Sequence, residues 1–370
     1  MATNVIASNP SAANTPSRRS YGILELLDAN QGLLLVLGLI AAYVPPLTRS
    51  LWVDEAGTFW MACRGPLAAI ERTSHWPGQS ILFAVVTSFF CVDASSPLRD
   101  LLLRVPALFG GATACFFIYR FAEDILDRGA GRIAAVLFAF SPSTIELATE
   151  ARPYTLAMAA AAASCWTLYR WARSRERSWL AACVFSSTLL IYFHYLFCAV
   201  FAAHAMFLGF ELIRARRFAR SGELLIGYAA IALLALPLVP HVLLLAHESY
   251  TLPFTSKPSG LDLARVLMPP LYTVGAFASA LLIHQARCNE IAGAARLSPQ
   301  VAGMLLSWWA MGPLALFAVT SGTSMQVFAP RYVAYSGLAL ALLLAWVACS
   351  AFGTRTARSL VPNMAAMRLV

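Results

Sequence analysis

Two adjacent carboxylates, Asp54 and Glu55, lie in the stretch SLWVDEAGTFW, directly after the first apolar run of the chain. An ionised side chain at the edge of the hydrocarbon is costly, so it calls for a partner or a task. A carboxylate can take a proton from an attacking hydroxyl group or bind a metal ion. The alternative is a solvated loop pair that forms salt bridges with Arg49 or Arg64. The residues alone leave both interpretations open.

A second polar stretch, SPSTIELATEARPYTLAMA, carries Glu150, Arg152 and Tyr154 between two apolar runs. The guanidinium group of Arg152 matches the oxygens of a phosphate, and near a membrane the expected anion is a lipid phosphate. A local ion pair between Glu150 and Arg152 that closes the turn would explain the same residues. Both interpretations place these side chains at a membrane boundary.

Two further sites interrupt apolar sequence. His194 and Tyr195, in IYFHYLF, divide a long apolar stretch into two predicted helices. A histidine there can donate to a phosphate or bind a metal ion, although such residues more often pack or cap. Arg331 and Tyr332 begin the last apolar run, where Arg331 would bind a phosphate or extend to lipid head groups. Each of these signals is weak alone.

The bulk composition identifies the class of protein that must position these residues. The 370-residue chain is 59% hydrophobic and 12% charged, with a mean hydropathy of +0.67. A soluble protein would carry about 25% charged residues. The sequence therefore predicts an all-α polytopic membrane protein. Residues 1–28 are expected to form a disordered cytoplasmic tail without a signal peptide, and 353–370 a short cytoplasmic tail.

The net charge of +9 comes almost entirely from arginine, because Lys257 is the only lysine. The basic residues gather between apolar runs, which favours topology signals over nucleic-acid binding. The eight cysteines form no CxxC pair and lie mostly inside apolar segments. They are expected to be small buried hydrophobic residues rather than a disulfide or metal framework. They are Cys63, Cys91, Cys115, Cys165, Cys183, Cys198, Cys288 and Cys349.

We expect about ten membrane-spanning helices with both termini in the cytoplasm. The predicted spans are 31–48, 101–120, 132–148, 153–172, 179–193, 195–213, 223–245, 266–286, 300–320 and 331–352. A further run, 79–92, is short for a span, since about 20 residues are needed. If it does not cross, most of the 27 basic residues face the cytoplasm, as the positive-inside rule requires. It then becomes a juxtamembrane element of a long first external loop, residues 49–100.

This topology places the four polar sites on the same, extracytoplasmic face. Two carboxylates, two arginines and a histidine on one face describe a site for an anionic, membrane-embedded substrate whose partner is a hydroxyl group. A divalent metal bound by Asp54 or Glu55 stays open, because the sequence shows no dedicated set of ligands.

The order of several segments resembles the GT-C type of integral-membrane glycosyltransferase, in particular the protein O-mannosyltransferases and the bacterial aminoarabinose transferases. These segments are LWVDEA, HWPGQSILF, LRVPALFGG, FAFSPSTIELATEARPYTLAMA, FHYLF and FAPRYVAYSGLALALLLAW. The resemblance covers roughly residues 30–215 and the RY pair near 331. The family's two-proline motif in the first loop keeps His75 and Pro77 here and lacks its second proline.

The resemblance implies a GT-C fold, a polyprenyl-phosphate sugar as donor and an acceptor on the extracytoplasmic side of a bacterial inner membrane. Asp54 would be the catalytic base with Glu55 beside it, and Arg152, Arg331 and His194 would bind the donor phosphate. The substrate-binding candidates are Glu150, Tyr154, His75, Gln79, Tyr195 and Tyr332. The acceptor would be a protein, a lipid or an envelope glycan, and membrane lipids would surround the chain.

Two other functions compete with transfer. A transporter or flippase of a lipid-linked sugar would explain the spans and the arginines. Transporters, however, place ionisable sites near mid-membrane and often show repeated halves, whereas these polar residues cluster at one face and no internal repeat is visible. A non-catalytic assembly scaffold is the third alternative. The sequence does not name the sugar or the acceptor.

Overall fold

The computed structural model describes residues 31–215, 221–248, 257–268, 296–323 and 325–358. Within these ranges the chain is helical, and no β-strand is present there. The elements are α2 (Gln31–Leu47), α3 (Val53–Ala62), α4 (Pro66–Ser74), α5 (Ile81–Ser88), α6 (Arg99–Ile125), α7 (Arg128–Ala139), α8 (Pro142–Ala148), α9 (Tyr154–Ser174), α10 (Arg177–Phe193), η1 (Tyr195–Val200), α11 (Phe201–Ala215), α12 (Ser221–Ala235), η2 (Leu236–Leu238), α13 (Val239–Glu248), α14 (Gly260–Leu267), α16 (Pro299–Gly322), η3 (Pro330–Val333) and α17 (Ser336–Arg358).

Several helices are long and apolar enough to cross a bilayer. Among the described residues four meet both criteria: Arg99–Ile125, Tyr195–Ile213, Gly222–His247 and Pro299–Gly322. Shorter apolar helices occupy Gly32–Leu47, Arg177–Phe193 and Ser336–Ser350. The predicted all-α polytopic membrane fold is confirmed. The number of about ten spans stays a prediction, because the expected span 266–286 lies almost wholly outside the described residues.

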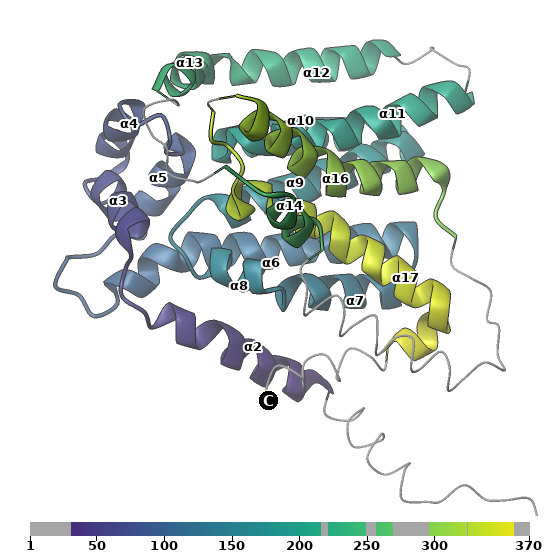
Figure 1. The fold of residues 1–370 in the computed structure, drawn as a ribbon, viewed down its shortest axis with the longest axis horizontal. Helices are drawn as coiled ribbons and strands as arrows, with labels where there is room; N and C mark the ends of the chain where they lie inside the picture. The colour runs from purple at the N-terminus through teal and green to yellow at the C-terminus, as the bar shows by residue number, and fades with distance from the viewer. Residues whose placement is uncertain (1–30, 216–220, 249–256, 269–295, 324, 359–370) are drawn as a thin grey trace, which may run out of the picture.

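Helix α9 lies at the centre of the bundle and packs against α6 and α10 (Figure 1). Its residues Ala157–Ala163 are all buried and, except for Met158, are alanines, whose small side chains let neighbouring helices approach closely. One close approach is at Gly110 of α6, where an added Cβ atom would lie 2.5 Å from the backbone nitrogen of Leu156. The position of α6 against α9 therefore depends on a glycine.

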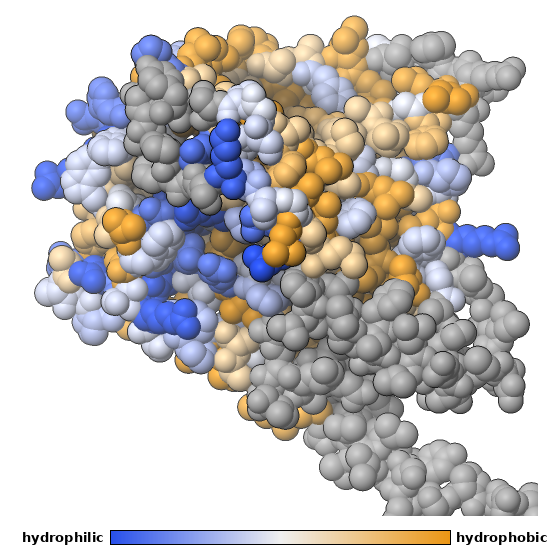
Figure 2. All heavy atoms as spheres, in the orientation of Figure 1, coloured by the Kyte–Doolittle hydropathy of each residue, from blue (hydrophilic) through white to orange (hydrophobic). Residues whose placement is uncertain are grey.

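Polar and apolar surfaces separate along the bundle. Hydrophilic side chains gather at the end formed by α3, α4 and α5, whereas hydrophobic side chains cover α12 and α16 (Figure 2). Exposed leucines and isoleucines such as Leu225, Ile226 and Leu233 on α12 fit contact with lipid. The long helices thus present an apolar belt, and α3–α5 lie at one polar end of it.

The segment 79–92, predicted not to span, contains the eight-residue helix α5. Eight residues rise only about 12 Å, well short of the roughly 30 Å of hydrocarbon. Helix α5 packs against α4 and, through a hydrogen bond from Ser80 Oγ to the carbonyl of Tyr192, against the end of α10. The short helices α3–α5 between α2 and α6 match the expected juxtamembrane elements.

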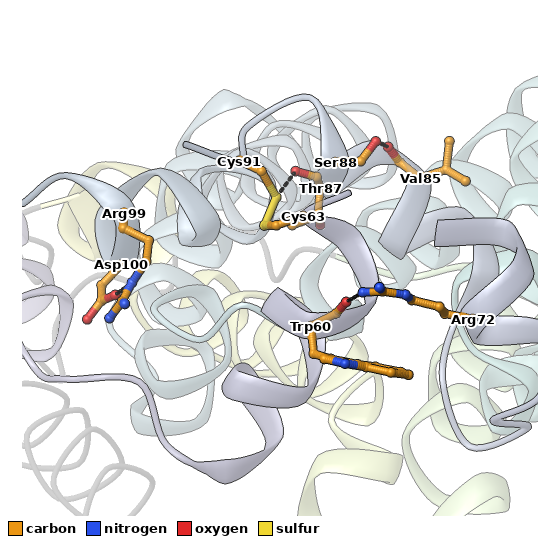
Figure 3. The surroundings of a disulfide bond; sticks show 9 residues. All are labelled: Trp60, Cys63, Arg72, Val85, Thr87, Ser88, Cys91, Arg99 and Asp100. Atoms are coloured by element: carbon orange, nitrogen blue, oxygen red, sulfur yellow. Dashed lines mark hydrogen bonds and ion pairs between the residues drawn. A yellow bond between two sulfur atoms is a disulfide. The ribbon is translucent and has the colours of Figure 1, made fainter. Parts of the chain in front are cut away.

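One expectation about the cysteines is wrong. Cys63 and Cys91 form a disulfide, with Cα atoms 5.3 Å apart (Figure 3). Cys63 caps the end of α3 and Cys91 follows α5, so the turns around α4 bring together two residues that are 28 positions apart. The cysteines expected to be buried are indeed buried or half-buried at positions 115, 165, 183, 198 and 349. Cys288 lies outside the described residues.

The close helix contact generates a stability prediction. Gly110→Ala should force α6 away from α9 and lower the free energy of unfolding by about 1–3 kcal/mol, the cost of overpacking. Gly209→Ala on α11 is the matched control, because an added Cβ atom there meets nothing within 4 Å. The control should keep or slightly raise stability, since alanine favours helix. Thermal unfolding of both variants in detergent measures the difference, and equal melting temperatures would contradict the packing argument.

Candidate active site

The first turn of α3 gives the two adjacent carboxylates different environments. Successive residues of an α-helix point about 100° apart, so Asp54 and Glu55 cannot face the same partner. The side chain of Glu55 is only 1% exposed, whereas that of Asp54 is 32% exposed. The buried carboxylate needs partners inside the bundle, and the other one faces an accessible site.

Glu55 is held by four donors. The guanidinium group of Arg104 donates from Nε to Oε1 at 2.8 Å and from Nη2 to Oε2 at 2.7 Å. The backbone N–H groups of Ala151 and Trp52 donate to the same two oxygens, at 2.8 and 3.3 Å. Both oxygens of this buried carboxylate are therefore occupied by donors of the protein itself. The geometry therefore favours a structural role for Glu55 over the catalytic role that the sequence suggested.

Arg104 is a site residue that the sequence reasoning missed. It lies one turn into α6, is 2% exposed, and also donates to the carbonyl oxygens of Leu47 and Arg49 at 2.9 and 2.8 Å. These carbonyls belong to the end of α2 and the chain just after it, which lack helical partners. The available signal was an arginine inside the apolar run LLLRVPALFGG, since such a charge requires a partner.

Asp54 faces two arginines from distant parts of the chain. Arg331 of η3 donates to its Oδ2 at 3.1 Å, and Nη2 of Arg152 lies 4.0 Å from the same oxygen. Arg152 also donates to Oε1 of Gln79 at 2.9 Å. Its Nε is buried without a hydrogen-bond partner among the described residues. Two guanidinium groups thus converge on one accessible carboxylate, and donor capacity is left over.

An aromatic wall adjoins this cluster. The ring centroid of His194 lies 5.2 Å from that of Tyr154 and 5.6 Å from that of Tyr332. Arg152 approaches the ring of Tyr154 at 5.8 Å, and Arg331 approaches Tyr332 at 5.8 Å. The first residue of α9, the end of α10 and η3 supply these three rings. The predicted convergence of the four polar stretches is thus present in the fold, while the roles of the residues stay predictions.

Two candidates lie apart from this cluster. His75 caps α4 and is exposed. The hydroxyl group of Tyr195 hydrogen-bonds to Nδ1 of His241, whose Nε2 donates to the carbonyl of Thr73 at 3.0 Å. This chain of contacts joins η1, α13 and α4. Tyr195 therefore has a partner that explains it without a substrate.

Glu150 lies in the turn between α8 and α9 and is half-buried. Burial, followed by the negative charges of Glu146 and Glu55, raises the pKa of its carboxyl group to about 7. The positive charges of Arg331 and Arg152 act in the opposite direction. Its protonation state therefore changes near neutral pH, next to the two arginines of the site.

The carboxylates do not form a pair of metal ligands. Glu55 binds Arg104, whereas Asp54 binds Arg331. Within the described ranges, no group of three or more histidine, cysteine or acidic side chains is arranged to hold a metal ion. What the cluster offers is cationic binding of an anion beside an accessible carboxylate.

Comparison with known proteins shows which family and which fold the chain resembles. Residues 82–242 match the family model described as dolichyl-phosphate-mannose-protein mannosyltransferase. No curated protein matches the chain. Among solved structures, ArnT from Cupriavidus metallidurans in the apo state matches with a TM-score of 0.55 and 15% identity, over 89% of this chain and 60% of that one. ArnT bound to undecaprenyl phosphate matches with a TM-score of 0.56 and 14% identity, over 92% and 62%.

The resemblance to GT-C membrane glycosyltransferases is confirmed. The matched family segment contains Glu150, Arg152 and His194 but neither Asp54 nor Arg331. Those two residues reach the site through the ArnT-like fold. The chain spans less than two thirds of the length of ArnT.

The separate environments of the two carboxylates predict different stability effects. Glu55→Gln should leave the charge of Arg104 buried without a counter-ion, which costs about 3–5 kcal/mol of unfolding free energy. Asp54→Asn should change stability by less than about 1 kcal/mol, because Asp54 is accessible to solvent. Thermal unfolding in detergent compares the two isosteric substitutions. Equal melting temperatures for the variants would show that Glu55 does not hold the fold.

Proposed function

We propose that the chain is a glycosyltransferase that moves a sugar from a polyprenyl-phosphate donor to an acceptor hydroxyl group on the extracytoplasmic side. The observation that carries this proposal is the accessible carboxylate of Asp54 between the guanidinium groups of Arg331 and Arg152. The family match and the similarity to ArnT bound to undecaprenyl phosphate support it.

The two arginines suit the phosphate of such a donor. A polyprenyl-phosphate sugar is a phosphodiester with one negative charge, and guanidinium groups bind phosphate oxygens with charge-assisted hydrogen bonds. Without a ligand, Asp54 is the counter-ion of both arginines. Donor phosphate would replace it, which would leave the Asp54 carboxylate able to accept a proton. The base would thus become available when the donor is bound.

The reaction we propose is one displacement at the anomeric carbon. Asp54 accepts the proton of the acceptor hydroxyl group, and the acceptor oxygen forms the new bond to that carbon. The bond to the phosphate oxygen breaks, and its electron pair leaves with the polyprenyl phosphate. Arg152 and Arg331 stabilise the charge that develops there. A single displacement inverts the configuration, in contrast to the double displacement of retaining hydrolases.

The remaining site residues would orient the donor. Tyr154, His194 and Tyr332 offer ring faces next to the arginines, where a sugar or the phosphate ester can pack. Gln79 holds Arg152 in place through its side-chain carbonyl. Positioning of this kind contributes strongly to rate, since the reacting atoms must lie in line.

The disulfide supports the proposed side of the membrane. Disulfides persist in oxidising compartments such as the bacterial periplasm and are rare in the cytosol. The Cys63–Cys91 bond lies between α3, which carries Asp54, and the end of α5. The first loop therefore suits the extracytoplasmic face of an inner membrane, in agreement with the positive-inside count.

The first test is transfer from radiolabelled polyprenyl-phosphate sugars by the purified protein in liposomes with a membrane extract. Asp54→Asn should lower transfer or donor hydrolysis by about 10²–10⁴-fold, the usual contribution of a general base. Asp93→Asn, an exposed position in the same loop, is the control and should keep wild-type activity. If a donor crosses the bilayer without being consumed, regardless of Asp54, the transporter interpretation replaces this proposal. If Asp54→Asn leaves all chemistry in cells unaffected, the chain is a scaffold.

The titration of Glu150 predicts the pH dependence of donor binding. Its pKa of about 7 lies above the ordinary value, so the carboxyl group is neutral below this pH and charged above it. The charged form competes with the phosphate for Arg152 and Arg331, while the charge of the phosphodiester stays constant. The apparent KM for the donor should therefore rise as the pH increases from 6 to 8. Glu150→Gln should flatten this profile, and a profile unchanged in the variant would exclude Glu150 as its cause.

A further inference from the structure

A cavity of about 580 Å³ lies beside the Asp54 site and is bordered by α7, α8, α14, η3 and α17. Its lining combines polar side chains with an apolar face of α17, here named the polar end and the apolar end. The polar end is lined by Ser141, Ser143, Glu146, Asp262 and Arg265. None of the residues that line the cavity has a role in the proposed chemistry.

The apolar end follows one face of α17. Gly337, Leu340, Ala341 and Leu344 line it, at the three- and four-residue spacing of a single helix face, and Leu137 of α7 faces them. From residue 336 to residue 344 this face rises about 12 Å. Helix α17 is one of the apolar helices of the bundle. A ligand of matching chemistry would therefore carry a hydrocarbon portion.

The polar end disfavours a phosphate. The carboxylate of Glu146 is exposed, and that of Asp262 lies 3.6 Å from Arg265. Two carboxylates and one guanidinium group leave a net negative charge, which repels an anion. The hydroxyl groups of Ser141 and Ser143 lie 3.0 Å apart and can both donate and accept hydrogen bonds. This chemistry fits a head group with hydroxyl groups and no negative charge.

The cavity and the Asp54 site share one wall. Pro330 and Val333 of η3 line the cavity, whereas Arg331 of the same segment binds Asp54. Glu146 of α8 borders the cavity. Glu150, four residues later in the turn before α9, interacts with Arg331 and Arg152. A head group at the polar end would thus lie next to the segment that carries the phosphate-binding arginine.

We infer that this cavity binds the acceptor, and that the acceptor is a membrane lipid whose head group carries hydroxyl groups and no phosphate. A glycosyl diacylglycerol has this chemistry. The acyl chains would lie along α17, and the hydroxylated head would lie at Glu146 and the two serines, near Asp54. Only the assignment as acceptor rests on the proposed transferase function; lipid binding does not depend on it.

The test measures equilibrium binding of radiolabelled monogalactosyl diacylglycerol to the full chain in phosphatidylcholine nanodiscs. Wild type should bind about one lipid. Leu340→Trp fills the apolar end and should weaken binding roughly tenfold or more, equivalent to about 1.4 kcal/mol. Glu146→Gln, at the polar end, should also weaken binding. The controls are Leu306→Trp, at an exposed position of α16, and Glu71→Gln, at an exposed position of α4, and both should bind as wild type.

Competition identifies the ligand class. Phosphatidylglycerol, which has hydroxyl groups and a phosphate, should compete poorly. Equal competition by phosphatidylglycerol would overturn the inference. Displacement by polyprenyl phosphate would also overturn it, because it would assign the cavity to the polyprenyl chain of the donor. No binding by wild type would also overturn it.

The outcome is separable from the proposed function. Asp54→Asn should bind the glycolipid normally even though it loses transfer. If the glycolipid binds but transfer to it never occurs with an active donor, the cavity is a lipid site without the acceptor role. If donor chemistry is absent in wild type while binding persists, the proposed function fails and the lipid site stands.

Discussion

The buried ion pair between Glu55 and Arg104 determines how the site is assembled. Its two side chains are 1% and 3% exposed, and charges so far from water are stable only when every donor and acceptor is satisfied. Satisfying them draws together the end of α2, the first turn of α3, the start of α6 and the backbone of Ala151. Such a pair contributes little net stability compared with apolar residues of similar size. Its hydrogen bonds, however, can all form in only one arrangement of these segments.

That arrangement explains why two neighbouring carboxylates have different environments. Because Glu55 is fixed to α6, the direction of the preceding residue on the helix is fixed as well. Asp54 must then face the opening between the turn before α9 and η3, where Arg152 and Arg331 lie. The acidic pair thus combines a buried anchor and an accessible carboxylate. The buried carboxylate of Glu55 fixes the position of the accessible carboxylate of Asp54, and preorganised sites require such fixed positions.

The sequence predicted the convergence of Asp54, Arg152 and Arg331, because topology alone places their segments at one membrane face. It did not separate Asp54 from Glu55, since that distinction depends on which carboxylate meets Arg104 across 49 residues of sequence. Arg104 itself was grouped with the apolar run around it. The pairing of Cys63 was missed for a similar reason: a search for closely spaced cysteines cannot detect a bond that the turns around α4 create.

In the proposed reaction, the charge arrangement makes Asp54 available only after the donor phosphate binds. The carboxylate of Asp54 is engaged as a counter-ion, because Arg331 donates a hydrogen bond to it. In the proposed reaction, an anion that competes for both guanidinium groups would release it. Because Nε of Arg152 retains unused donor capacity, a phosphate can add hydrogen bonds that Asp54 alone does not make. In the proposed reaction, the exchange of one anion for another would therefore couple recognition of the lipid phosphate to the appearance of the base.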